Sequence, residues 1–155
     1  MVSASGVDRA ARGADAPSCL FCEIVRGERP ATRVVETGAC VAFLDTRPLF
    51  PGHVLVVPRL HVVTLPELAP EQIEPLFGLV RRLAGAVERG LEADGSFVAL
   101  NNRVSQSVPH LHVHVVPRRA KDGLKGFFWP RTKYADTSDA EAVAARIRAA
   151  LEPAA

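Results

Sequence analysis

Three of the five histidines in this 155-residue chain stand at alternate positions, His110, His112 and His114, in the segment HLHVHVV. Alternate residues of a β-strand share one face, so a strand here would form a row of three imidazoles opposite a row of apolar side chains. Imidazole can act as a nucleophile, a proton donor or a metal ligand near neutral pH. The row therefore permits two chemistries. A central histidine can attack phosphorus, or two or three rings can hold a metal whose bound water attacks.

A polar strand surface without chemistry is the third explanation of the row. It is the weakest, because histidine is neither common nor favoured in strands. The spacing alone does not choose between the nucleophile and the metal ligand.

Cys19 and Cys22 form a second candidate group with CxxC spacing. Two thiolates at this spacing can reach one zinc ion, but two ligands do not complete a site, and two core thiols are the alternative. Cys40, in the apolar run CVAFL, is predicted to be a core residue. Since three cysteines cannot all pair within one chain, we expect thiols or metal ligands rather than a disulfide framework.

Composition sets limits on the class of protein. With 48% hydrophobic and 23% charged residues, the chain has the composition of a globular protein with one core. The formal net charge of +2 does not predict a nucleic-acid or membrane partner, whereas a small anionic ligand remains possible. The N-terminus lacks the apolar stretch of a signal peptide and no apolar run has the length of a membrane span, which predicts a cytoplasmic location.

The elements that must position these residues follow from hydrophobic periodicity. Residues 1–17 are predicted to be a flexible tail, and residues 18–155 a single domain with a C-terminal extension from about 118. Apolar residues three or four apart predict a helix from Pro70 to between Gly90 and Gly95, and a last helix over about 139–151. Strand patterns cover 33–36, 40–45, 53–58, 96–101 and 110–116. The order predicts an α+β fold with a mainly antiparallel sheet.

The segment 118–134 is rich in basic and aromatic residues, with Phe127, Phe128 and Trp129 at its centre. Stacking on bases within a positive field is one interpretation. Packing of the C-terminal tail onto the body or across a dimer is the preferred one.

Beyond the histidine row, the chain resembles the histidine-triad (HIT) family of nucleotidyl hydrolases and transferases. HLHVHVV matches the motif that names the family, and the blocks CLFCEIVRGERPATRVVE, VAFLDTRP, PGHVLVVPRLH and QSVPHLHVHVVPR occur in the family's order. The resemblance covers about residues 19–118. It implies a five-stranded antiparallel sheet with one long helix, a homodimer and a purine nucleotide as substrate.

The resemblance also implies roles for the histidines. His112 would attack the α-phosphate and carry a covalent nucleotidyl group, which water then removes. This needs an unprotonated attacking nitrogen, with the other ring nitrogen donating to a nearby backbone carbonyl. His114 would contact phosphate oxygens or the leaving group, best as a cationic ring. His53 in PGH would support the site without reacting.

Other matching positions imply substrate contacts. Ser107 and Gln106 correspond to phosphate contacts, Asn101 to an asparagine near the same phosphate, and Asp45 to the carboxylate that holds the ribose hydroxyls. From the residues alone, Ser107 could equally cap a loop and Asp45 could start a turn. Positions that enclose the base are matched by Leu20, Phe21, Ile24 and Phe43, which could also be core residues. The loop NNRVSQSV is shorter than the family's and lacks its glycines, so Asn101 and Asn102 both remain candidates.

Some members of the family hold a structural zinc with four residues that this sequence supplies, Cys19, Cys22, His61 and His110. A Cys₂His₂ set is closed and tetrahedral, which makes such a metal structural. The leading hypothesis is a hydrolase acting on purine nucleoside phosphoramidates or dinucleoside polyphosphates. The alternatives are a metal-dependent hydrolase with a catalytic ion at the histidine row, and a nucleotide-binding module without turnover.

Overall fold

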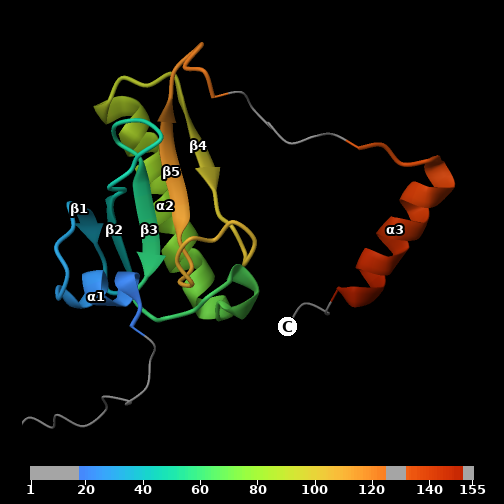
Figure 1. Cartoon of the computed structure of the whole chain (residues 1–155), viewed down its shortest axis with the longest axis horizontal. Coiled ribbons are helices and arrows are strands. Elements are labelled where there is room, and N and C mark those ends of the chain that lie inside the picture. Colours follow the sequence, from blue (N-terminus) through green and yellow to red (C-terminus); the bar gives the residue numbers. More distant parts are fainter. Residues whose placement is uncertain (1–17, 125–131, 152–155) are drawn as a thin grey trace, which may run out of the picture. The chain divides into compact units, whose positions relative to one another are not determined.

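The computed structural model describes residues 18–124 and 132–151 (Figure 1). The predicted tail, residues 1–17, and the aromatic residues Phe127, Phe128 and Trp129 lie outside these ranges. The chain divides into two units, one ending at Asp122 and one beginning at Gly123. The first carries the sheet and the candidate site. The assignment of residues 18–155 to one domain stays a prediction.

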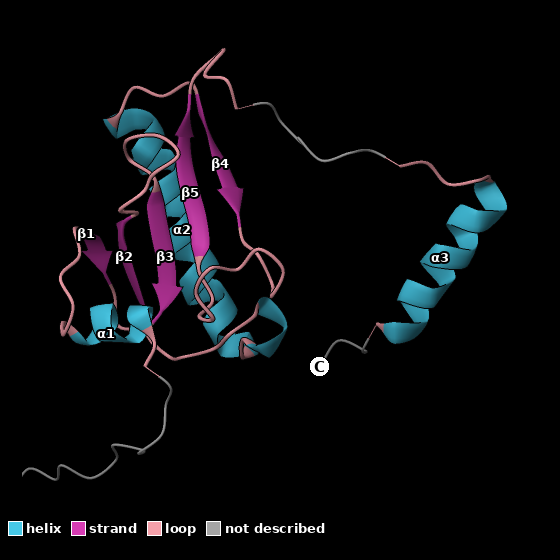
Figure 2. Ribbon diagram, viewed as in Figure 1, coloured by secondary structure: helices cyan, strands magenta, loops and turns pink. Residues whose placement is uncertain are grey.

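The first unit is built on one antiparallel sheet of five strands in the order β1-β2-β3-β5-β4 (Figures 1 and 2). This architecture confirms the predicted α+β fold with a five-stranded antiparallel sheet. The strands are β1 (Arg33–Glu36), β2 (Cys40–Leu44), β3 (Val54–Pro58), β4 (Gly95–Ala99) and β5 (Val113–Arg118).

Alternation along the central strands divides the interior into two clusters. In β3, Val54 and Val56 face the cluster formed with the long helix, whereas Leu55 and Val57 face the opposite cluster. All four are buried because the sheet is covered on both faces. This explains why β3 is almost continuously apolar rather than alternating with polar residues.

The long helix α2 (Pro70–Gly90) packs on one face of the sheet. Pro70 stands at its start, where a missing N–H costs no hydrogen bond, and Pro75 is accommodated near the beginning. Its buried side chains recur at helical spacing, as predicted. They are Leu76, Leu79, Val80, Leu83 and Val87. A short 3₁₀ turn, η1 (Leu65–Glu67), precedes it.

A short helix over the opposite face, α1 (Leu20–Arg26), was not predicted. Phe21 and Ile24 lie one turn apart and are buried in the second cluster. The helix ends at Gly27, whose φ of 77° is a left-handed conformation in which its N–H reaches the carbonyls of Glu23 and Ile24.

The second unit contains helix α3 (Thr137–Ala150), which begins two residues before the predicted start. Its cap is Asp136, whose side chain accepts the N–H of Asp139 at 2.9 Å. Among the described residues, no helix is both long enough and apolar enough to span a membrane.

Candidate active site and metal site

The histidine row lies on the face of the sheet opposite helix α2. Leu111, Val113 and Val115 are fully buried in the α2 cluster, so the alternate residues face the other way. The regular strand begins only at Val113, and His110 and His112 occupy the extended segment that leads into it. The backbone there is held by the Leu111 N–H, which donates to the carbonyl of Val62 at 2.7 Å.

His112 has a hydrogen bond that fixes its tautomer. Its Nδ1 lies 2.7 Å from the carbonyl oxygen of His110, and a carbonyl can only accept, so Nδ1 carries the proton. In the neutral ring the lone pair is therefore on Nε2. The ring is 3% exposed and contacts Phe21 edge to face at a centroid distance of 5.2 Å. This is the arrangement that a nucleophilic imidazole needs.

His114 receives its orientation from His53. The Leu49 N–H donates to His53 Nδ1 at 3.2 Å, so His53 carries its proton on Nε2. His53 Nε2 lies 2.9 Å from His114 Nδ1 and donates to it. The remaining proton of neutral His114 is thus on Nε2, and the ring lines the same pocket as His112.

Electrostatics keep His114 neutral. Burial, followed by the proximity of His112 and His53, lowers the pKa of His114 to about 4. Burial also lowers the pKa of His53. We expected a cationic ring at His114, but at neutral pH without ligand it is a neutral donor, because the apolar surroundings and two neighbouring rings disfavour the charge.

Beside these histidines lies a pocket of about 740 Å³. Asp45, Ser107, Phe21 and Phe43 line it, as do Leu20 and Ile24. Phe21 and Phe43 contact each other edge to face at a centroid distance of 5.4 Å. The structure thus brings most of the predicted substrate-binding residues together around one cavity.

Asp45 has a local structural role as well as a place in the pocket. Its Oδ1 accepts the N–H of Arg47 at 2.8 Å, the turn-forming use that was the alternative interpretation. Its Oδ2 lies 3.8 Å from His53 Nδ1. One carboxylate can make the turn and still offer lone pairs to the pocket.

Asn101 and Gln106 are not among the pocket-lining residues. Asn101 donates to the carbonyl of Ser105 at 3.3 Å, and Gln106 donates to the carbonyl of Val63 at 2.6 Å. Asn102 accepts the N–H of Leu65 at 2.8 Å. In this structure all three hold the loop in place, and the phosphate contacts assigned to Asn101 and Gln106 stay predictions.

The four predicted metal ligands also meet. The ligand atoms of Cys19, Cys22, His61 and His110 all lie within 4.8 Å of one another. His110 Nε2 donates to the carbonyl of Pro58 at 2.8 Å, which leaves Nδ1 free to face the sulfurs. His110 Nδ1 is 3.5 Å from each sulfur, and His61 Nδ1 is 3.2 Å from that of Cys22.

These distances fit a tetrahedral site. Zinc bonds of about 2.3 Å to sulfur and about 2.1 Å to nitrogen give a sulfur-to-nitrogen edge of about 3.6 Å. Without a metal, burial and the neighbouring Cys19 raise the pKa of Cys22 to about 11, and burial lowers the pKa of His110 to about 4. A divalent cation would compensate the thiolate charge, so the residues fit the ion.

Among the pocket-lining residues that were not predicted, two are charged, Arg29 and Arg47. Arg29 follows α1, and its Nε donates to Glu23 at 2.8 Å. Arg29 lies within the matched block CLFCEIVRGERPATRVVE, but neither its residue type nor its spacing indicated a place in the pocket. The segment that contains Arg29 is placed at the pocket by its contact with β2, where the Leu44 N–H donates to the carbonyl of Thr32.

Comparison with known proteins agrees with this geometry. The family described as HIT domain matches residues 26–121. A HIT family protein from Bacillus subtilis has a similar structure, with a TM-score of 0.81 and 30% identity, covering 89% of this chain and 100% of that one. The fold and the site thus define a histidine-triad protein. This chain belongs to the HIT family.

Two further relatives bear on function. The adenosine 5'-monophosphoramidase of Schizosaccharomyces pombe is 35% identical over 114 residues, which are 73% of this chain and 84% of that protein. A Zn-bound histidine triad family protein from Mycobacterium smegmatis has a TM-score of 0.66 and 37% identity, covering 86% of this chain and 98% of its own.

Proposed function

We propose that this HIT protein is a nucleotide hydrolase that cleaves purine nucleoside phosphoramidates or dinucleoside polyphosphates at the α-phosphate. His112 Nε2 attacks phosphorus, the bond to the leaving group breaks, and the leaving group takes up a proton. Water then attacks the same phosphorus, and the bond to His112 breaks. The observation that carries the proposal is the 2.7 Å hydrogen bond from His112 Nδ1 to the carbonyl of His110.

His114 and Ser107 complete the phosphate end of the pocket. The Nε2–H of His114 can donate to a phosphate oxygen or to the leaving group, and the Ser107 hydroxyl can donate to an α-phosphate oxygen. A neutral donor suits this place because it puts no positive charge beside His112 in the free pocket. The name of the S. pombe relative supports the phosphoramidate class.

The test follows the covalent intermediate. Protein mixed with a guanosine or adenosine phosphoramidate and quenched rapidly in alkali should carry one nucleotidyl group on the peptide that contains His112. His112→Ala should lose both the adduct and nucleoside monophosphate release. Full turnover by His112→Ala would refute the assignment, whereas nucleotide binding without turnover by the native protein would favour the module without catalysis.

We propose that the Cys₂His₂ group binds a structural zinc ion. Zinc would join the start of α1, the segment after β3 and His110. Because the carbonyl of His110 orients His112, the metal supports the nucleophile indirectly. The Zn-bound M. smegmatis relative supports this assignment.

One observation bears on the alternative of a catalytic metal. Ligand atoms of Asp45, His53 and His114 lie within 4.8 Å of one another. In the present geometry both nitrogens of His53 are engaged, one by the Leu49 N–H and one by His114. Full activity of chelator-treated, folded protein would exclude this alternative. The homodimer and the cytoplasmic location stay predictions.

A further inference from the structure

The pocket runs across the strands of the sheet. Strand pairing sets His114 opposite Leu55, Leu55 opposite Phe43, and Phe43 opposite Arg33. His114, Leu55 and Phe43 all line the pocket. Strands are about 4.8 Å apart, so Phe43 lies roughly 10 Å from His114 and the line of β1 roughly 14 Å from it. In the proposed reaction, a nucleotide with its α-phosphate at His112 would have room to extend its base over Phe43 toward the segment before β1.

Arg29 stands at that far end. The segment Arg29 to Ala31 lines the pocket and leads into β1. The Arg29 N–H reaches the carbonyl of Glu23 at 3.3 Å, and its side-chain Nε donates to the carboxylate of Glu23 at 2.8 Å. Backbone and side chain are thus both tied to α1. Within the described residues, the two terminal Nη groups have no hydrogen-bond partner.

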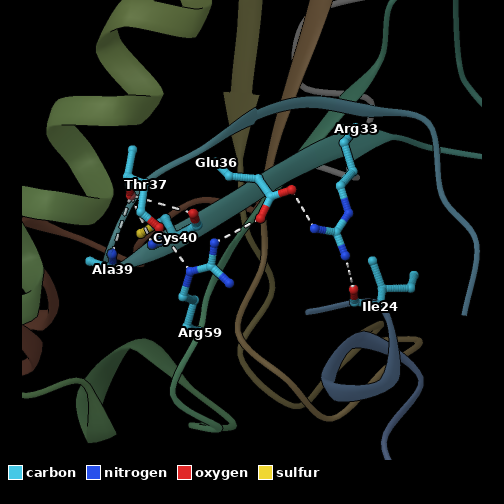
Figure 3. A network of polar contacts seen from close by, with 7 residues as sticks. All are labelled: Ile24, Arg33, Glu36, Thr37, Ala39, Cys40 and Arg59. Carbon is cyan, nitrogen blue, oxygen red and sulfur yellow. Dashed lines mark hydrogen bonds and ion pairs between the residues drawn. The ribbon is translucent and has the colours of Figure 1, made fainter. Parts of the chain in front are cut away.

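The neighbouring arginine of β1 is already engaged. Arg33 donates to the carbonyl of Ile24 at 2.5 Å and pairs with Glu36, which in turn pairs with Arg59 at 2.8 Å (Figure 3). This network fixes the start of β1 against the end of α1. Of the two arginines beside the start of β1, Arg29 is therefore the one whose terminal nitrogens are left for a ligand.

We propose that Arg29 selects guanine over adenine in the nucleotide of the proposed reaction. Guanine presents two adjacent acceptors, O6 and N7, which match the donors of a guanidinium, whereas adenine presents the N6 amino donor beside N7. Arginine has only donors, so adenine leaves one of them facing another donor. Glu23 holds Nε and so leaves the two Nη groups to face the base edge.

The inference rests on the proposed function, and its test compares bases at constant leaving group. We expect kcat/KM for guanosine and inosine phosphoramidates of the same amine to exceed that for adenosine by about tenfold, the lower part of the range for an arginine–guanine pair. Inosine shares O6 and N7 with guanine but lacks the 2-amino group. Inosine grouping with guanosine would therefore assign the selection to the O6/N7 edge, and inosine grouping with adenosine would overturn the assignment.

Variants locate the effect. Arg29→Met keeps the length but removes the donors, and should bring the guanosine-to-adenosine ratio close to one. Arg29→Lys should give an intermediate ratio, because it keeps the charge without the planar fork. Arg47→Met is the matched control in the same pocket and should leave the ratio unchanged. Retention of the native ratio in Arg29→Met, or equal use of the two bases by the native protein, overturns the proposal.

A binding measurement separates this inference from the proposed reaction. Calorimetry with GMP, IMP and AMP reports base preference even if no substrate is turned over. GMP and IMP should bind the native protein about tenfold more tightly than AMP, and Arg29→Met should lose that difference. Absence of turnover together with this preference would refute the hydrolase and keep the base selection. Turnover together with equal binding of GMP and AMP would keep the proposed hydrolase and overturn the base selection.

Discussion

His53 Nε2 lies 2.9 Å from His114 Nδ1, and this contact determines which nitrogen of His114 faces the pocket with a proton. His114 lines the pocket and His53 is not among the lining residues, so His53 is placed to act through His114 rather than on substrate. The hydrogen bonds form a chain in which the Leu49 N–H donates to His53 and His53 donates to His114. Removing the middle donor would free His114 to adopt the other tautomer.

The first prediction concerns this contact. His53→Leu should lower kcat by about 10- to 100-fold, the usual effect of losing a partner that orients a reacting group, with a smaller change in KM. His53→Gln should recover part of the rate, because its amide can donate near the position of Nε2. Steady-state kinetics with a phosphoramidate measures both. Equal loss in the two variants would indicate a structural role alone.

The second prediction concerns Asp45. Asp45→Asn keeps an oxygen for the Arg47 N–H, so the turn should survive, while one acceptor for the ribose hydroxyls is lost. The native protein should prefer a ribonucleoside phosphoramidate over its 2'-deoxy analogue by about tenfold, as for one hydrogen bond to a charged group. The variant should show a ratio near one. An unchanged ratio would leave Asp45 with its turn-forming role only.

Most of the fold was predictable because its signals are local. Short runs of β-branched and other apolar residues mark β1 to β3, and three- and four-residue spacing of apolar residues marks α2. Helix α1 was missed because it has only 7 residues. Its buried pair, Phe21 and Ile24, and the terminal Gly27 together were the available signal.

The site was predictable in part for the same reason. Spacing in the sequence identified the histidine row and the cysteine pair, but partners distant in the chain decide what each ring does. His53 meets His114 across 61 positions. The backbone conformation of the loop after Asn101 could not be predicted for another reason. Arg103 and Ser105 adopt φ values of 66° and 60°, and nothing in their residue types announces a left-handed backbone.

The third prediction concerns the metal. Protein purified without chelator should contain about one zinc per chain, and Cys22→Ser should lose it. At a free zinc concentration 100 times the dissociation constant, zinc binding raises the free energy of unfolding by about 2.7 kcal/mol. At roughly 4 °C for each kcal/mol, the melting temperature should fall by about 10 °C on metal removal.

Cys40→Ser provides the matched control for the metal. Cys40 is 1% exposed in the cluster beneath α2, and it is not part of the four-residue metal group. This variant should keep the zinc even if it loses stability through a buried hydroxyl. Zinc content measured by elemental analysis distinguishes the Cys22→Ser variant from the Cys40→Ser variant. Equal zinc content in both variants would contradict the assignment of Cys22 as a ligand.

The last prediction follows from the lowered pKa of His114. The pKa is about 4 in the folded chain and about 6.5 in the unfolded one, so between these values the unfolded chain binds more protons. The stabilisation is therefore complete above pH 6.5 and is lost as pH falls toward 4. The shift corresponds to at most about 3 kcal/mol, and partial exposure of the ring reduces this to about 1 to 2 kcal/mol. The free energy of unfolding, measured with urea at several pH values from 4.5 to 7.5, should depend less steeply on pH for His114→Gln than for the native protein at equal zinc loading. His110 is common to both proteins, so parallel curves would show that His114 does not carry this proton uptake.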